Sequence, residues 1–379
     1  RERGTRRTLT PPYQRGEDGL ESLDMRRGRW HSAGVDLPGL GWNSFFKTAF
    51  APHAADGLRP ARVALEHKHA CVLFAEDGEF IGEASGRLLR YARRAALPAV
   101  GDWVAFEKRA EGSRCTIHAV LPRRTAFSRR AAGGREEEQV VAANIDTVFL
   151  VSGLDVDFNL RRMERYLALA RASGVQPVLV LNKLDACLDL TLRLEEARGI
   201  AGDVPTHAIS AGRGDGIDAL GAHMGPGKTI ALLGSSGVGK STLVNRLFGG
   251  DRQAIGAVKE DDGRGRHTTT RRELIRLADG TLLIDTPGMR EIQLWASPRD
   301  GLNAVFPDIV ALGAGCRFRD CRHGSEPGCA VRAAAAEDRL PAGRFASFQK
   351  LRAELEELDK VSTVAARTRV RVKGRRILR

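Results

Sequence analysis

The sequence contains no apolar run approaching the roughly 18 residues that a bilayer-spanning helix needs, so it predicts no transmembrane segment and no membrane partner. Its charged first residues are not followed by a long apolar core, so a secretory signal peptide is not expected. It also lacks an initiator methionine. Residues 1–39, rich in Arg and Gly and without periodicity, are expected to be a disordered or non-native extension. These absences predict a cytoplasmic protein.

Cysteine is scarce, with six among 379 residues, and half of it stands in one cluster. Cys71, Cys115 and Cys187 are isolated and are expected to be reduced core residues. The cluster combines three thiols with one imidazole, the ligands of a closed tetrahedral Zn²⁺ site, which would be structural because no coordination position stays open. A disulfide is the alternative, although thiols stay reduced in a cytosol. The four clustered residues are Cys316, Cys321, His323 and Cys329.

Acidic residues are outnumbered: 60 Lys and Arg stand against 47 Asp and Glu, which gives a formal charge of +13. Such an excess favours the capture of polyanions without identifying which one. Residues 367–379 hold seven Lys or Arg and no acid. This tail is either a solvated disordered segment or an arm that neutralises RNA phosphates, and both can hold because a disordered arm can order on binding.

A phosphate-binding loop follows a short apolar run at 228–234 and precedes a helical pattern at 242–248. This strand–loop–helix context is what the pattern G-x-x-x-x-G-K-S requires. Its glycines let backbone N–H groups turn toward phosphate oxygens, and the helix N-terminus adds partial positive charge. We expect Lys240 to reach the β- and γ-phosphates and the Ser241 hydroxyl to bind Mg²⁺. The expected phosphate-binding residues are Gly234, Ser235, Ser236, Gly237, Val238, Gly239, Lys240, Ser241 and Thr242.

A second segment, after the buried-strand run at 176–181, predicts a preference for guanine. The carboxylate of Asp185 can accept hydrogen bonds from N1–H and the exocyclic amine of guanine, a donor pair that adenine lacks. Such a site rejects the wrong base because its own groups would be left unpaired. A further strand ends where a backbone N–H could meet guanine O6, since strand ends meet at one edge of a parallel sheet. The expected guanine-binding residues are Asn182, Lys183, Leu184, Asp185, Ser210 and Ala211.

Two more segments would complete a catalytic centre. Asp285 ends the strand expected at 281–285 and would hold Mg²⁺ through water, and the N–H of Gly288 would sense the γ-phosphate. The polar, glycine-rich residues 261–270 indicate a switch loop that orders when GTP binds, with a merely solvated loop as the alternative. One of its three threonines would close on Mg²⁺. These are Thr268, Thr269 and Thr270.

The guanine-reading segment lies before the phosphate loop, whereas an ordinary GTPase has the phosphate loop first. The complete set in rotated order therefore indicates a circularly permuted GTPase. The order NKLD, SA, GSSGVGKST, GRHTTT and DTPG resembles the RsgA family, also called YjeQ or YloQ, of bacterial small-ribosomal-subunit biogenesis GTPases. Segments at 40–46 and 100–104 and the Cys/His cluster resemble the family too, so the resemblance covers residues 40–360.

The flanking regions predict two further units. Short apolar runs separated by turn signals between residues 60 and 130 predict a small antiparallel barrel, and the resemblance implies an OB-fold, a frequent RNA-binding module. Residues 345–359 show the apolar spacing of an amphipathic helix. Basic barrel residues could form an RNA-binding face, with ordinary surface charge as the alternative: Arg87, Arg90, Arg93, Arg94, Lys108 and Arg109.

The expected architecture is multidomain. An N-terminal OB-fold β-barrel is expected at 40–135 and a central circularly permuted α/β P-loop GTPase domain at 136–305. A C-terminal zinc-binding domain, with the amphipathic helix and the basic tail, is expected at 306–379. The strand–helix–strand order between residues 146 and 181 predicts a parallel sheet in the central domain.

One departure from ordinary GTPases bears on hydrolysis. Met289 follows the DTPG segment, where many GTPases carry a glutamine that orients the attacking water. The resemblance therefore implies slow intrinsic turnover with help from elsewhere. His267 in the switch loop is a candidate, because a neutral imidazole can position water near neutral pH. A surface position or a nucleic-acid contact is the alternative for His267.

Together, the motifs and the resemblance predict a Mg²⁺-dependent GTPase, stimulated by the small ribosomal subunit, that acts as a monomer in late assembly of that subunit. The expected partners are the small subunit and its rRNA, with the nucleotide state controlling binding and release. Two alternatives are a GTPase of a protein or small-molecule pathway and a nucleic-acid-binding module with a structural nucleotide.

Overall fold

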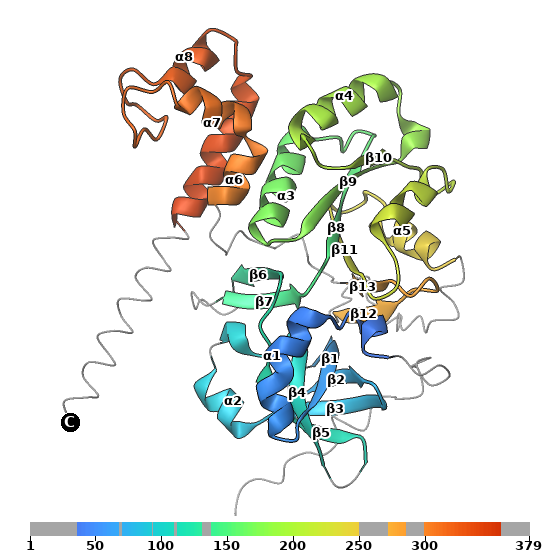
Figure 1. Cartoon of the computed structure of the whole chain (residues 1–379). Coiled ribbons are helices and arrows are strands. Elements are labelled where there is room, and N and C mark those ends of the chain that lie inside the picture. The colour runs from blue at the N-terminus through green and yellow to red at the C-terminus, as the bar shows by residue number, and fades with distance from the viewer. Residues whose placement is uncertain are drawn as a thin grey trace, which may run out of the picture.

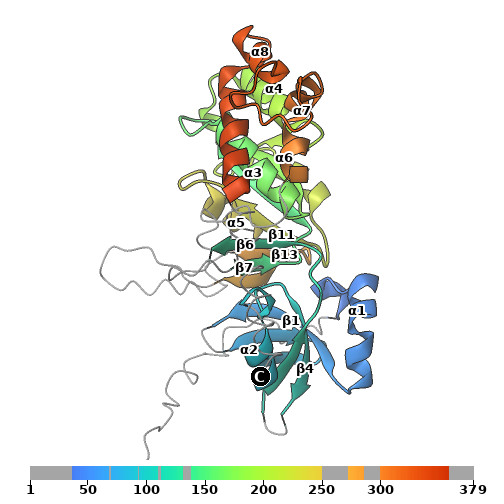
Figure 2. The ribbon, with the colours of Figure 1, turned by 90° about the vertical axis from the view of Figure 1, so that its left-hand side faces the viewer.

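The computed structural model describes residues 36–67, 70–92, 94–109, 112–130, 138–249, 272–285 and 299–357. The molecule has three units: a β-barrel lies below a sheet flanked by helices, and a group of helices lies beside that sheet (Figures 1 and 2). Within these ranges, no helix has the length and apolarity needed to cross a membrane.

The N-terminal unit is a closed five-stranded barrel. Its strands follow the order β1-β2-β3-β5-β4, and β1 pairs with β4 to close it. All pairs are antiparallel except β3 with β5. Large apolar side chains such as Leu73, Phe106 and Ile117 fill the interior. The expected OB-fold barrel is confirmed. The strands are β1 (Arg59–Glu66), β2 (Cys71–Ala75), β3 (Gly78–Ala84), β4 (Trp103–Lys108) and β5 (Arg114–Val120), with α2 (Gly86–Tyr91) and η4 (Arg94–Ala96) between β3 and β4.

The opening segment lies against the barrel. Asn43 begins α1 (Ser44–Ala55), since its Oδ1 accepts hydrogen bonds from the N–H groups of Phe45 and Phe46. Trp42 meets Trp103 of β4 edge to face, with ring centroids 4.6 Å apart. The two N-terminal segments that resemble the family therefore pack on each other. The turn η3 (Pro38–Leu40) shows that described structure starts slightly before residue 40.

The central unit is a sheet of order β10-β9-β8-β11-β13-β12, in which the first five strands are parallel and β12 runs antiparallel. Alternate side chains of β8 enter two cores, Val148 and Leu150 on the side of α3 and α4, and Phe149 and Val151 on the side of α5. The elements are β8 (Thr147–Gly153), α3 (Leu160–Ala172), β9 (Gln176–Asn182), η5 (Leu184–Ala186), α4 (Leu190–Ala201), β10 (Thr206–Ala208), η6 (Ile217–His223), β11 (Thr229–Leu233), α5 (Lys240–Leu247), β12 (Glu273–Arg276) and β13 (Leu282–Asp285).

The barrel and the central sheet are joined by strand pairing. Leu65 of β1 pairs with Glu273 of β12, so one sheet runs through both units. A separate hairpin, β6 (Ala126–Arg130) and β7 (Glu138–Ala143), connects them along the chain. The expected boundary at 135/136 falls between these two paired strands, in a stretch outside the described residues. The domain limits stay predictions.

A buried arginine fixes the same junction. The Arg62 side chain is 1% exposed and donates hydrogen bonds to the carbonyls of Leu40, Gly101 and Asn144 and, at 2.8 Å, to Thr229 Oγ1. Burial lowers the pKa of Arg62 to about 10, so the guanidinium stays charged at neutral pH. Because Thr229 starts β11, this contact ties the barrel to the strand that leads into the phosphate loop.

The C-terminal unit is helical and packs on α3 (Figure 1). It contains α6 (Arg299–Val305), α7 (Pro307–Gly313), α8 (Ala330–Ala336) and a helix at 342–357, which corresponds to the expected amphipathic helix. Phe348, Leu351 and Leu355 form its buried stripe. Glu164 of α3 is fully buried and accepts a 2.9 Å hydrogen bond from Arg344, which anchors this helix to the central unit.

Candidate nucleotide-binding site and metal centre

The phosphate loop lies between β11 and α5, at the carboxyl edge of the parallel strands. Gly239 has φ +94°, and a Cβ there would stand 2.3 Å from Asn182 Nδ2, so only glycine fits this turn. The Lys240 ammonium donates hydrogen bonds across the loop to the carbonyls of Gly234 and Ser235. Ser241 and Thr242, in the first turn of α5, are exposed.

Asn182 holds the guanine-reading segment against the phosphate loop. Its side chain is 2% exposed at the end of β9. Nδ2 donates to the carbonyl of Val238 at 2.7 Å, and Oδ1 accepts from the Ala211 N–H at 2.9 Å. One buried amide thus joins three segments that are far apart in sequence. The structure therefore brings the predicted guanine and phosphate residues to one edge of the sheet.

The carboxylate of Asp185 lies at the surface of this edge. It accepts a 2.5 Å hydrogen bond from the Ser210 hydroxyl. This hydrogen bond lowers the pKa of Asp185 below its usual value, so the group is ionised at neutral pH and can only accept hydrogen bonds. An exposed pure acceptor matches the N1–H and amine edge of guanine. Leu184 is held beside it, since its N–H donates to the Ile209 carbonyl at 3.0 Å.

Asp285 ends β13, which pairs in parallel with β11, so its carboxyl end lies at the same edge as the phosphate loop. This position suits an indirect Mg²⁺ ligand. The other catalytic candidates lie outside the described residues. They are His267, Thr268, Thr269, Thr270 and Gly288.

The loop between β8 and α3 contributes polar residues that the motif search misses. Asp157 accepts hydrogen bonds from Arg162, at 2.7 Å, and from the Ser235 hydroxyl, at 2.6 Å. Asp155 pairs with the Lys183 ammonium at 2.6 Å. The loop thus contacts both the phosphate loop and the guanine-reading segment. A signal exists in the sequence, because two aspartates directly follow a buried strand of the same parallel sheet.

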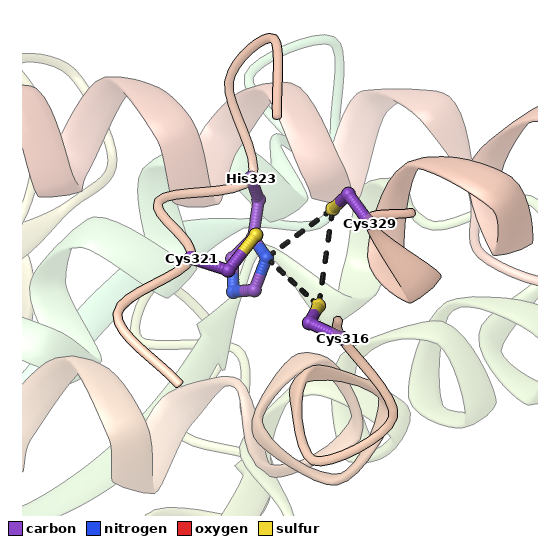
Figure 3. Close-up of side chains that lie close together, drawn as sticks. All are labelled: Cys316, Cys321, His323 and Cys329. Atoms are coloured by element: carbon purple, nitrogen blue, oxygen red, sulfur yellow. Dashed lines mark hydrogen bonds between the residues drawn. The ribbon is translucent and has the colours of Figure 1, made fainter. Parts of the chain in front are cut away.

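The predicted metal ligands converge in the C-terminal unit. Their ligand atoms all lie within 4.8 Å of one another, between the end of α7 and the start of α8 (Figure 3). Cys329 also caps α8, since its sulfur accepts a hydrogen bond from the Arg332 N–H. The cluster joins two helices and the loop between them: Cys316, Cys321, His323 and Cys329.

The spacing of the cluster fits a tetrahedral zinc site. Cys316 and Cys329 have sulfurs 3.9 Å apart, and His323 Nδ1 lies 3.6 Å and 3.4 Å from them. Zn–S and Zn–N bonds of ordinary length place such atoms about 3.8 Å and about 3.6 Å apart. Burial lowers the pKa of His323, which favours the neutral imidazole that can ligate a metal. The donor set and its geometry are consistent with zinc.

All six cysteines are free thiols, so the disulfide alternative finds no support. Cys71 and Cys115 are buried in the barrel, and burial raises the pKa of each to about 12. Cys187 is half-buried against the main core. These three behave as the small core residues expected from the sequence.

Comparison with known sequences is consistent with this geometry. A family model described as RsgA GTPase matches residues 120–295. A protein of Opitutus terrae named small ribosomal subunit biogenesis GTPase RsgA is 55% identical over 329 residues, which cover 84% of this chain and 90% of that protein. A protein of Syntrophotalea carbinolica with the same name is 41% identical over 352 residues, 91% of this chain and 96% of that protein.

Two solved structures resemble the whole arrangement. YjeQ from Thermotoga maritima matches with a TM-score of 0.57 and 27% identity, over 79% of this chain and 98% of that one. YloQ, described as a circularly permuted GTPase, matches with a TM-score of 0.55 and 22% identity, over 79% and 96% of the two chains. At 22% identity, the likeness to YloQ is evidence for the fold only.

Proposed function

The chain belongs to the RsgA family of GTPases, and from that membership we propose that it hydrolyses GTP during late assembly of the small ribosomal subunit. Support comes from relatives that carry this role in their names. The observation that carries the proposal is the convergence of Asp185, Ala211, Lys240 and Asp285 at one sheet edge of a permuted GTPase fold.

The residues at this edge of the sheet would contact the base, the phosphates and the Mg²⁺ of a bound GTP. The Asp185 carboxylate would accept from N1–H and the amine of guanine, and the Ala211 N–H, which donates to Asn182 Oδ1 in this structure, would be shared with guanine O6. Lys240 and the loop N–H groups neutralise the β- and γ-phosphates. A bound Mg²⁺, held by the Ser241 hydroxyl and Asp285, would add positive charge at the phosphates. Asp157 and Arg162 keep Ser235, and therefore the loop, in its binding shape.

The residue that positions the attacking water is proposed to be His267, because Met289 stands where a glutamine is common. A switch threonine, one of residues 268–270, would complete the Mg²⁺ shell. Closing of this loop around the γ-phosphate would shield the reaction from bulk water.

The barrel contacts the segment that follows the proposed switch loop. Arg272 follows the switch threonines and begins the described structure after them. Its guanidinium forms a 3.1 Å ion pair with Glu66 at the end of β1, next to the Leu65–Glu273 strand pairing. Movement of the switch loop would therefore pull on a barrel strand. This link supports control of the barrel by the nucleotide state.

The C-terminal unit is linked to the phosphate loop through one turn of α3. Arg162 donates a 2.5 Å hydrogen bond to Ser235 of that loop. Glu164 and Arg165 pair with Arg344 and Glu354 of the C-terminal helix. A shift of α3 between nucleotide states would thus be transmitted to this unit. We propose that GTP holds both flanking units in the arrangement that grips the subunit.

The remaining parts of the proposal follow from this role. The Cys/His cluster would hold one structural Zn²⁺ and thereby keep the C-terminal unit folded. The basic surface would contact rRNA phosphates, and the protein would act as a monomer in the cytoplasm.

GTP turnover with and without purified small subunits tests the proposal. At saturating GTP, small subunits are expected to raise turnover about tenfold or more, because they would complete an active site that lacks a glutamine. Large subunits serve as the control and should have little effect. His267→Ala is expected to retain GTP binding and to lose most of the stimulated turnover.

The outcomes separate the rival functions. Turnover that small subunits leave unchanged would favour a GTPase of another pathway. GTP that binds tightly but is not hydrolysed, even with subunits, would favour a structural nucleotide. Wild-type stimulated turnover in His267→Ala would remove the role proposed for that histidine alone.

A further inference from the structure

The helix α2 leaves two large apolar side chains in solvent. Leu89 is 60% exposed and Tyr91 is 75% exposed, whereas Leu88 packs against the barrel core. Leu88 thus attaches the helix to the barrel, and its neighbours do not contribute to that attachment. Leu89 and Tyr91 are two positions apart and therefore lie on different sides of the helix, so the Tyr91 ring is a separate exposed surface that a partner could cover.

The same helix and the short turn η4 that follows it are strongly basic. Arg87, Arg90 and Arg94 are exposed, and none of them forms an ion pair with another described residue. The guanidinium carbon of Arg90 lies 5.8 Å from the centre of the Tyr91 ring. The sequence from Ser85 to Gly101 contains no acid. An exposed ring with a cation beside it, in a field of positive charge, suits a planar group carried on a polyanion.

The acids on the neighbouring strands are already paired. Glu83 at the end of β3 contacts Arg109 at 3.0 Å, and Glu107 of β4 contacts His118 at 3.1 Å. The turn η4, which carries Arg94, packs on β7 of the hairpin. In Figure 1, α2 lies at the outer side of the barrel below this hairpin.

We propose that α2 and the adjoining η4 bind single-stranded RNA, with an unpaired nucleobase stacked on Tyr91 and with Arg87 and Arg94 on the flanking phosphates. Duplex RNA would use only the positive charge, since its bases are not available for stacking. An acidic protein segment would satisfy the arginines without needing a flat aromatic surface. The inference rests on the proposed RNA-facing function and assigns it a site and a kind of ligand.

The test compares Tyr91→Ala and Tyr91→Phe in the full chain. The probes are a labelled single-stranded oligoadenylate and a blunt-ended RNA duplex without unpaired bases. Tyr91→Ala is expected to weaken oligoadenylate binding about tenfold, as the loss of one stacked base does, and Tyr91→Phe to bind nearly as wild type. Duplex binding should change less than about twofold. The matched control is Leu188→Ala, a 104% exposed apolar residue of the central unit, which should have no effect.

Salt dependence tests the arginines. Arg87→Ala is expected to reduce the slope of log affinity against log salt concentration by about 0.7, as the loss of one phosphate contact to a single strand does. Because these side chains are exposed, the variants should have the melting temperature of the wild type. A change in affinity then reflects binding and not unfolding.

Wild-type oligoadenylate affinity in Tyr91→Ala would overturn the proposal. The proposal would also be overturned if Tyr91→Ala lost affinity for the small subunit but kept its affinity for oligoadenylate, because α2 would then be a protein-docking surface. Failure of the proposed function would look different: small subunits would not stimulate wild-type turnover, whatever the oligoadenylate result.

Discussion

Asparagine in place of Asp185 is expected to lower the preference for GTP over xanthosine triphosphate by about two to three orders of magnitude. The carboxylate is ionised and accepts the Ser210 hydroxyl, so it offers acceptors alone to the base. An amide offers one acceptor and one donor, which match N1–H and the 2-carbonyl of xanthine and leave the guanine amine facing a donor. Titration calorimetry of the variant with both nucleotides measures the change.

The control for this experiment is Asp189→Asn, a nearby exposed carboxylate. Asp189 caps α4, accepting a 3.0 Å hydrogen bond from the Leu192 N–H, and asparagine caps equally well. It should keep the wild-type preference for GTP. Unchanged base preference in Asp185→Asn would show that this segment does not read guanine.

Removal of the metal is expected to unfold the C-terminal unit while leaving the barrel and the central sheet folded. Closed zinc sites of this ligand type contribute on the order of 10 kcal/mol to the folding of small units. Here the cluster joins the ends of α7 and α8 across residues 314–329, which form no helix or strand of their own. Cys329→Ser, or treatment with a strong chelator, should expose 299–357 to proteolysis and lower stimulation by small subunits.

Cys187→Ser serves as the matched control, because Cys187 is a half-buried thiol outside the cluster. It should keep one zinc per chain and the wild-type cleavage pattern. A protein that is purified without metal, yet has a protease-resistant C-terminal unit, would contradict the structural role of zinc.

The elements that carry the site could be predicted because their patterns are local. A buried strand of a parallel sheet is a continuous apolar run, so β8, β9, β11 and β13 are visible in the sequence. The glycines and lysine of the phosphate loop occur at fixed spacing within one loop. The order of these motifs also predicts the permuted fold, which the comparisons confirm.

Contacts between distant segments could not be predicted in this way. The pairing of Leu65 with Glu273 joins two domains, and no sequence periodicity in either strand indicates it. An arginine in a strand is expected to be exposed, yet Arg62 is buried by segments far away along the chain. No motif includes Arg162, and the position of Asp157 after a buried strand does not identify its partner, because Ser235 lies far along the chain. Tertiary packing alone shows what these residues do.

Affinity for purified small ribosomal subunits in two nucleotide states tests the central claim most directly. The wild-type chain would be titrated against subunits with a non-hydrolysable GTP analogue and, separately, with GDP. The account predicts binding about tenfold or more tighter with the analogue, since a ligand shifts a conformational equilibrium only through different affinities for its states. Equal affinity in the two states would contradict it.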